Sequence, residues 1–407
     1  MNSGNTLVAL VSAGLTGGLA GFVLCRFVRW LLDEIEADEG GQDSHANKLG
    51  KQELGKSAPH YCSMTVVGCC LVAVGIVWWE VICQGLLPHN VGGPSATSPA
   101  LFVRAWGHLI FFWFLAAAAW VDIRYRVIPD IITTPGVVCG LIALAIFPEV
   151  LLPVPAIKER SFAAATLTAD FLVAWGPLSL SKAVDSSVLH LLTTVVLFVL
   201  WWVICTSRWT TENKDISKRV VQRVNQCVSE PRNVVFVLGI AILCIVNWFG
   251  GVRLAAIESG MIGLAVSAGI VWFTRAGASV ALGREAMGMG DVTLMAMVGV
   301  WLGWQPAVVI FFLATFIGLI HGLFQLVMHR ENELPFGPSL CLAAVLVTLF
   351  WQPVWDWASV LFDDVVQLGT VLGLVVVLTA VTLSHLKKIV SYFLKAHLFL
   401  SKLPEFS

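Results

Sequence analysis

Long apolar runs alternate with short polar segments along almost the whole chain. A helix needs about 20 mainly apolar residues to cross the hydrocarbon core of a bilayer. Candidate spans of this kind lie near residues 5–28, 62–87, 101–121, 130–152, 187–205, 233–250, 256–274, 291–304, 307–328, 337–353 and 366–386. The run 291–304 is short, so we expect a tilted helix that begins inside the protein. The pattern predicts an all-α fold, a polytopic bundle of transmembrane helices with about 11 spans (8–11).

Composition supports a membrane-resident class. Hydrophobic residues make up 57% of the 407 residues, charged residues only 13%, and the mean hydropathy is +0.83. Soluble domains contain roughly 45–50% apolar and about 25% charged residues. The formal net charge of -1 gives no indication of a nucleic-acid partner. The ten cysteines form no CxxC pair, so neither a zinc site nor a disulfide framework is expected.

The positions of lysine and arginine predict the orientation of the chain. Cytoplasmic loops of membrane proteins carry an excess of these residues. With the N-terminus outside, 20 of the 25 lysines and arginines fall on the cytoplasmic side, and the opposite orientation inverts that ratio. We therefore expect the N-terminus outside and the C-terminus in the cytoplasm.

Few acidic residues lie at or near the candidate spans, and acids at helix depth are costly and informative. In the expected topology Asp122 and Asp291 reach the same membrane face although about 170 residues separate them in sequence. Glu80, Glu149 and Glu258 fall nearer the other ends of their helices. The topology thus singles out one pair of aspartates.

The residues around each aspartate refine this interpretation. Asp122 precedes Pro129 and Asp130, which suit the first turn of a helix, so Asp130 has a structural explanation without chemistry. Asp291 follows Gly288 and Gly290. Two glycines before an acid allow close backbone approach, here by an extended peptide. A helical substrate must unwind before its backbone can be cut, and an exposed backbone edge beside the acid would pair with the unwound segment.

Three segments together resemble the type IV prepilin peptidases, bacterial members of the GxGD intramembrane aspartyl proteases. The segments are VDIRYRVIPDIITTPG (121–136), GREAMGMGDVTLMAMVGVWLGW (283–304) and LPFGPSLCLAA (334–344). The resemblance implies that Asp122 and Asp291 are the catalytic pair. It also implies supporting or substrate-binding roles for Gly288, Gly290, Pro335, Phe336, Gly337, Pro338 and Asp130. Two carboxylates near one water share a proton, so one activates the water and the other donates to the substrate.

This resemblance also suggests how the chain is divided. Residues 1–100 form an N-terminal helical pair with a cysteine-free cytoplasmic loop at about 31–60. Residues 101–156 and 251–386 form the peptidase membrane core, 157–250 an insertion with two extra spans, and 387–407 an amphipathic C-terminal tail.

Departures from the family pattern bear on cofactors. The family's longer members carry two CxxC pairs in the first cytoplasmic loop, thought to bind zinc, and methylate the new N-terminus with S-adenosylmethionine. The loop 31–60 contains no cysteine, so we expect no metal, and S-adenosylmethionine only if the methyltransferase activity is retained. Proteolysis itself needs no cofactor. Thr293 stands where the family usually has lysine.

The resemblance implies cleavage of prepilin or pseudopilin leaders at the cytoplasmic face of the bacterial inner membrane, by a multi-pass protein embedded in the lipid bilayer. The alternative is a weak or inactive relative that binds pilin-like transmembrane helices; a transporter is a third interpretation, although no internal repeat supports it. Gly14, Gly17, Gly18 and Gly21 are spaced for close helix packing, either within the chain or in a homodimer.

Overall fold

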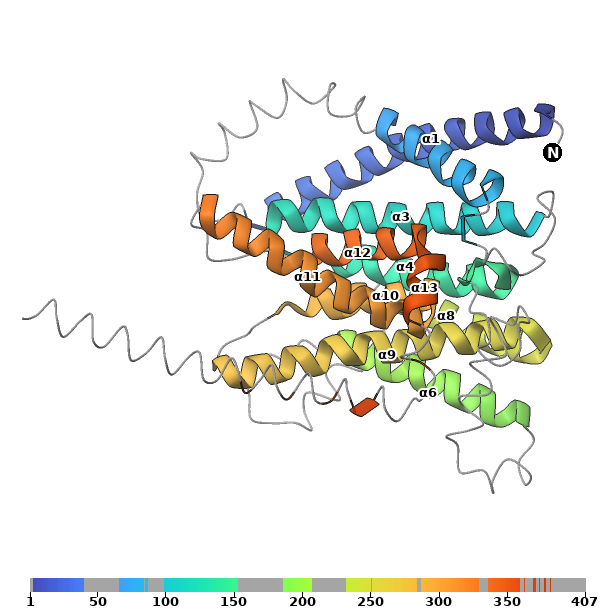
Figure 1. Cartoon of the computed structure of the whole chain (residues 1–407). Coiled ribbons are helices and arrows are strands. Elements are labelled where there is room, and N and C mark those ends of the chain that lie inside the picture. The colour runs from blue at the N-terminus through green and yellow to red at the C-terminus, as the bar shows by residue number, and fades with distance from the viewer. Residues whose placement is uncertain are drawn as a thin grey trace, which may run out of the picture.

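The computed structural model describes residues 3–39, 66–83, 85–86, 99–152, 186–206, 232–249, 251–283, 287–328, 336–358, 362, 369–370, 373, 377 and 381. In this part of the chain every regular element is helical, and the helices lie side by side in a bundle (Figure 1). The α-helices are α1 (Ser3–Glu39), α3 (Pro99–Tyr125), α4 (Asp130–Ile146), α6 (Ser186–Thr206), α8 (Arg232–Phe249), α9 (Gly251–Leu282), α10 (Met289–Leu302), α11 (Trp304–Met328), α12 (Gly337–Leu349) and α13 (Trp351–Ala358). A further apolar helix, Val66–Ile82, ends in the π-helical turn η1 (Trp78–Ile82), and η2 (Pro148–Val150) is a 3₁₀ turn.

The all-helical fold class is confirmed for the described residues, and every expected span from 5–28 to 337–353 overlaps a helix. Four of these helices are long and apolar enough to cross a membrane, or up to five if the α12–α13 pair, bent by 91°, is one span. Shorter apolar helical segments of 10–17 residues are Val66–Ile82, Asp130–Ile146, Leu191–Val203, Phe236–Phe249 and Met289–Leu302. The count of eleven spans and the orientation stay predictions.

Helix α10 lies at the centre of the bundle, in contact with α3, α4, α9, α11 and α12. All its residues from Asp291 to Leu302 are buried. At about 1.5 Å per residue its 14 residues span about 21 Å, less than the roughly 30 Å of a hydrocarbon core. The helix is followed by Gly303, whose φ of 90° is a backbone conformation that residues other than glycine rarely adopt. The expectation of a short helix beginning inside the protein is met.

Glycines allow two neighbouring helices to pack closely against α10. Gly136 of α4 faces Met297, and its carbonyl oxygen accepts a hydrogen bond from Trp301 Nε1 at 2.9 Å. On the other side, Gly299 lies against the backbone of Gly263 in α9. The carbonyl oxygen of each glycine occupies the position that a Cβ on the other would take, so any side chain at either position would displace a helix.

We therefore expect Gly299→Ala to destabilise the protein by about 1–3 kcal/mol, the usual cost of overpacking a core. A matched control is Gly269→Ala in α9, where an added Cβ meets no atom within 4 Å. That control should be neutral or slightly stabilising because alanine favours helix over glycine. Thermal unfolding in detergent, followed by circular dichroism, measures both. Equal stability of the two variants would contradict the close approach of α9 and α10.

The glycine face of α1 packs within the chain. A Cβ on Gly17 would lie 2.7 Å from Ala73 Cβ, and one on Gly21 would lie 2.9 Å from Cys69 Cβ. Both partners belong to the Val66–Ile82 helix of the same chain. Of the two interpretations of these glycines, packing within the chain is the one that the structure contains; a homodimer stays a prediction.

Three expectations about boundaries need correction or fall outside the described residues. The polar loop expected from about residue 31 begins later, because α1 continues to Glu39 through residues that favour helix. The run 130–152 is not one helix: α4 ends at Ile146, and Pro148 begins the short turn η2. The tail 387–407, most of 366–386 and much of the insertion lie outside the described residues. The domain boundaries stay predictions.

Candidate active site

Asp122 lies in the last turn of α3 and is 4% exposed. Its carbonyl oxygen accepts a hydrogen bond from the Arg126 amide at 2.8 Å, and Arg126 leaves the helix with a φ of 57°. The carboxylate of Asp122 points at the backbone amide of Gly337, the first residue of α12. Its Oδ2 is buried and has no hydrogen-bond partner within the described part of the chain. A buried carboxylate oxygen without a partner is costly, which marks a place for another ligand such as water.

Asp291 is the third residue of α10, in its first turn, and it is buried (7% exposed). Gly288 is the N-cap residue, and its backbone amide donates to the Asp291 carboxylate. An acid at this position that reaches back to the N-cap amide stabilises a helix start. Helix capping alone would therefore account for Asp291, but it does not account for the second buried aspartate beside it.

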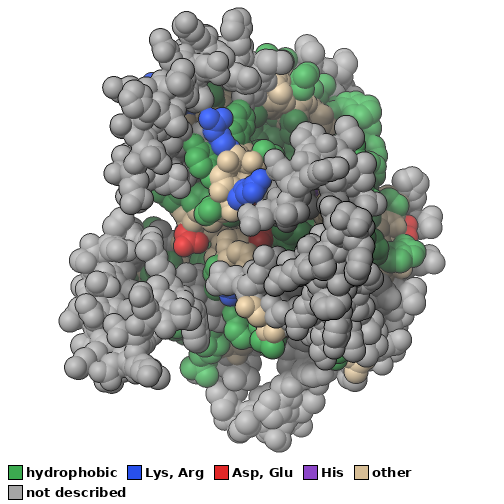
Figure 2. Space-filling view, turned by 90° about the vertical axis from the view of Figure 1, so that its left-hand side faces the viewer, with side chains coloured by type: hydrophobic (Ala, Val, Ile, Leu, Met, Phe, Trp, Pro, Cys, Tyr) green, Lys and Arg blue, Asp and Glu red, His purple; other side chains and the backbone are tan. Residues whose placement is uncertain are grey.

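Both aspartates lie at one end of the bundle. They are near enough for their carboxyl groups to interact electrostatically with each other and with the Cys341 thiol of α12. Ile128 lies between the segments that carry them: it contacts Gly290 beside Asp291 and Gly337 beside Asp122. This is the end of Figure 1 at which α3 finishes and α10 and α12 begin. Figure 2 looks onto it and shows acidic and basic side chains near one another, with hydrophobic side chains around them in the coloured part of this face.

The structure also places the supporting residues that the sequence predicts. A Cβ on Gly290 would lie 2.8 Å from the Ile128 carbonyl oxygen, and one on Gly337 would overlap Asp122 Oδ2, so both positions need glycine. Phe336 is the N-cap of α12 and Pro338 lies in its first turn, where proline is well tolerated. Asp130 is exposed at the start of α4, as its structural interpretation predicts. Pro335 lies outside the described residues.

Two further residues of this end, Thr133 and Arg275, are not singled out by the sequence. Thr133 of α4 donates a 3.2 Å hydrogen bond to Thr293, whose hydroxyl in turn donates to the Gly290 carbonyl oxygen at 3.0 Å. Arg275 of α9 donates to the carbonyl oxygen of Met287, just before Gly288. These bonds connect α4 and α9 to the segment that carries Asp291. Thr293, in the place of the family's lysine, is thus a buried structural residue here.

Cys341 is the third side chain of the site. It is buried, and it lies four residues after Gly337 in α12, hence on the same helix face. No cysteine motif in the sequence indicates this position near the carboxylates. The arrangement provides two buried carboxylates, a helix amide and an unsatisfied acceptor, which is suited to handling protons at a bound water. No group of three or more His, Cys, Asp or Glu able to hold a metal occurs among the described residues.

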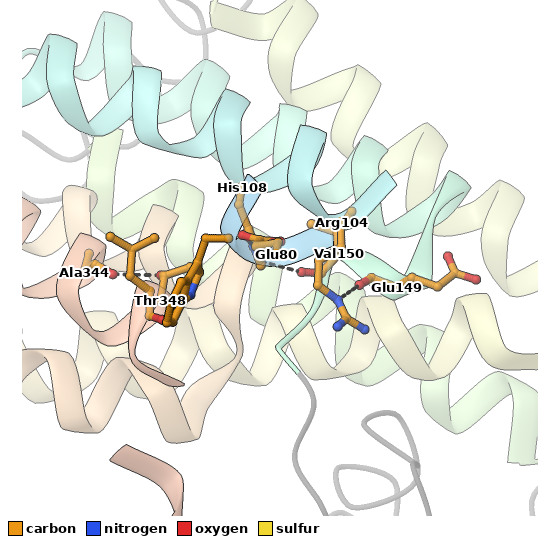
Figure 3. A network of polar contacts seen from close by, with 9 residues as sticks. Glu80, Arg104, His108, Glu149, Val150, Ala344 and Thr348 are labelled. Atoms are coloured by element: carbon orange, nitrogen blue, oxygen red, sulfur yellow. Dashed lines mark hydrogen bonds and ion pairs between the residues drawn. The ribbon is translucent and has the colours of Figure 1, made fainter. Parts of the chain in front are cut away.

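A second buried polar cluster lies near the other end of α3 (Figure 3). His108 Nδ1 is 2.7 Å from Glu80 Oε1, and His108 Nε2 is 3.0 Å from the Val150 carbonyl oxygen. Arg104 Nε donates to the Glu149 carbonyl oxygen at 2.8 Å. His108 and Asp122 are 14 residues apart in one helix, about 21 Å at 1.5 Å per residue. This cluster is therefore separate from the aspartate pair, as the expected topology places Glu80.

Comparisons with known proteins agree with the sequence motifs. Residues 230–323 match the type IV leader peptidase family. The prepilin leader peptidase/N-methyltransferase of Aeromonas salmonicida is 35% identical over 78 residues, 18% of this chain and 27% of that protein. The corresponding protein of Stutzerimonas stutzeri is 34% identical over 110 residues, 26% of this chain and 37% of that protein. No solved structure matches the chain.

The chain thus spans about a quarter to two fifths of the length of these curated relatives. The matched range contains Asp291 and helices α9 and α10, and it also includes α8, within the segment that the sequence assigns to an insertion. Asp122 lies outside it. The segment that carries Asp291 is therefore similar to the type IV leader peptidase family, which confirms the resemblance that the sequence motifs indicate.

Proposed function

We propose that this protein is a membrane aspartyl endopeptidase that removes the leader peptides of type IV prepilins or pseudopilins. One observation carries the proposal: Asp122 and Asp291, remote in sequence, are buried together where α3 ends and α10 begins. A relationship to proteins named prepilin leader peptidase/N-methyltransferase supports the choice of substrate.

In the proposed mechanism the two carboxylates share one proton, since two neighbouring carboxylates do not both ionise easily. The ionised carboxylate takes a proton from a water molecule, and the water oxygen attacks the scissile carbonyl carbon. The protonated carboxyl donates to the carbonyl oxygen. When the C–N bond breaks, the amine leaves with a proton from the pair. The buried, unpartnered Oδ2 of Asp122 offers an acceptor for that water.

The excess of lysine and arginine supports an orientation with the aspartate end at the cytoplasmic face of the bacterial inner membrane. Because eleven is an odd number of spans, a cytoplasmic C-terminus places the N-terminus outside. The substrate leader would reach the aspartates from the cytoplasm, while its apolar helix stays in the bilayer. We propose proteolysis without methylation, because the loop 31–60 lacks the cysteines of the family's bifunctional members.

The direct test is cleavage of a candidate prepilin by the protein in membranes, with mass spectrometry of the product. The resemblance to prepilin peptidases implies a substrate leader that ends in glycine, so we expect a new N-terminus immediately after that glycine, with no added methyl group. An intact prepilin after prolonged incubation would reject the peptidase. A methylated product would reject only the proposal about methylation.

A glycine substitution tests the geometry around Asp122. In Gly337→Ala the new methyl group would occupy the position of Asp122 Oδ2 and displace the carboxylate. Because a misplacement of about 1 Å can cost roughly a hundredfold in rate, we expect a loss of that order in kcat. The matched control, Gly269→Ala, adds a methyl group in open space and should cleave like the wild type. Normal kcat in Gly337→Ala would contradict this positioning.

A further inference from the structure

An apolar groove lies between the Val66–Ile82 helix, α3 and α12. It encloses about 760 Å³, within the range of pockets that hold ligands. On α3 it extends from Phe112 to Ile123, about 16 Å along the helix axis, or three helical turns. Among the described residues every side chain along it is apolar.

One end of the groove lies beside Asp122. Ala119 and Ile123 line it from α3 and flank Asp122 in sequence, and Pro338 lines it beside Gly337. At the opposite end, Trp79 joins two of its walls, because Trp79 Nε1 donates to the Leu349 carbonyl oxygen at 2.9 Å. A body lying along the groove would therefore have one end beside Asp122.

The groove suits a helix. Gly75 lines one wall, and a Cβ there would meet no atom within 4 Å; Ala116 and Ala119 line the facing wall. Small residues allow a second helix backbone to approach closely in a membrane. Val72 and Ile123, 51% and 65% exposed, offer apolar surface at the same place.

We infer that this groove binds the apolar transmembrane helix of the substrate, the segment that follows the prepilin leader. The inference rests on the proposed function and adds where the substrate lies. A substrate helix seated over three turns along α3 brings its cytoplasmic end to Asp122 and Asp291. The leader then extends past them into the cytoplasm, and the peptide bond between leader and helix lies at the carboxylates.

The first test fills the groove. Gly75→Phe places a ring in open space within the groove, and Gly269→Phe places the same ring in open space on α9, outside it. We expect Gly75→Phe to raise KM for prepilin at least about tenfold, with unchanged thermal stability, and Gly269→Phe to behave like the wild type. Unchanged KM in Gly75→Phe would overturn the inference.

The second test detects the occupant directly and does not depend on Gly75→Phe folding. A photoreactive phenylalanine analogue replaces Leu342, which is 48% exposed and lines the groove from α12; the control position is Phe316, 63% exposed on α11. With the slow variant Asp291→Asn holding uncleaved prepilin, we expect a crosslink from position 342 to the prepilin helix and none from 316. Crosslinks from 342 to lipid alone would overturn the inference.

The outcomes separate this inference from the proposed function. Cleavage by wild type with no effect of Gly75→Phe and no crosslink at 342 would reject the groove and leave the peptidase intact. A crosslink to prepilin without cleavage by wild type would support the groove and reject the peptidase in favour of an inactive binder of pilin-like helices. Neither cleavage nor a crosslink would reject both.

Discussion

Asp122→Asn and Asp291→Asn are each expected to reduce kcat for prepilin cleavage by at least about a thousandfold. An asparagine amide has nearly the shape of the carboxyl group but can neither take a proton from water nor return one to the leaving amine, and proton transfer by one positioned group contributes roughly 10²–10⁴-fold. Both side chains are buried and lie in the same cluster, so neither has solvent to replace the lost proton transfer. The measurement is the single-turnover rate in membranes.

Because the two carboxylates act as one unit, the double variant should be no slower than either single variant. Asp356→Asn, at an exposed position on α13, controls for the general effect of an aspartate-to-asparagine change and should cleave normally. Circular dichroism should show unchanged helix content in all variants. Cleavage within tenfold of wild type in either single variant would eliminate a two-aspartate mechanism, as would multiplicative losses in the double variant.

The helices are predictable because the hydrophobicity of a segment depends only on its own residues. Each long apolar run needs no information from elsewhere to indicate a helix, and the boundaries of α6 and α8 lie within a residue of the expected spans. Boundaries fail where local helix preference continues beyond the apolar run, as in α1 to Glu39, or where proline ends it, as at Pro148. The burial of α10 from Asp291 to Leu302 depends on its neighbours, although its short apolar run already suggests a helix inside the protein.

The candidate site is predictable to the extent that topology and motif coincide. The expected topology places Asp122 and Asp291 at one membrane face, and the structure places both at the same end of the bundle; the catalytic pair itself stays a prediction. The partners that surround them are long-range: Thr133 and Thr293 are 160 residues apart, and no local pattern pairs them. Cys341 had a usable signal, its spacing of four from Gly337 on one helix, but a cysteine in an apolar run has no visible chemistry until its neighbours are known.

His108→Phe is expected to destabilise the protein by roughly 3–5 kcal/mol, the cost of removing one partner of a buried polar pair. One ring nitrogen of His108 donates to the Val150 carbonyl oxygen, and a single proton between the other nitrogen and Glu80 satisfies both groups. Without His108, Glu80 loses its hydrogen-bonded partner and keeps the electrostatic effect of Arg104. Its Oε2 has no hydrogen-bond partner in the described structure even with His108 present. Unfolding in mixed detergent with increasing dodecyl sulfate measures the loss.

The Glu80→Leu/His108→Phe double variant should be more stable than His108→Phe alone. Glu80→Leu removes the carboxyl group that His108→Phe leaves buried without its partner. Replacing a whole buried polar pair by apolar residues is often close to neutral. Glu80→Gln should cost far less than His108→Phe, because its amide still hydrogen-bonds to the imidazole. Since His108, the partner of Glu80, lies about 21 Å from Asp122 along α3, all three variants should keep the wild-type kcat at a temperature where they remain folded. Additive losses in the double variant would show that Glu80 and His108 stabilise the fold independently, and a fall in kcat would show that this cluster is coupled to the aspartates.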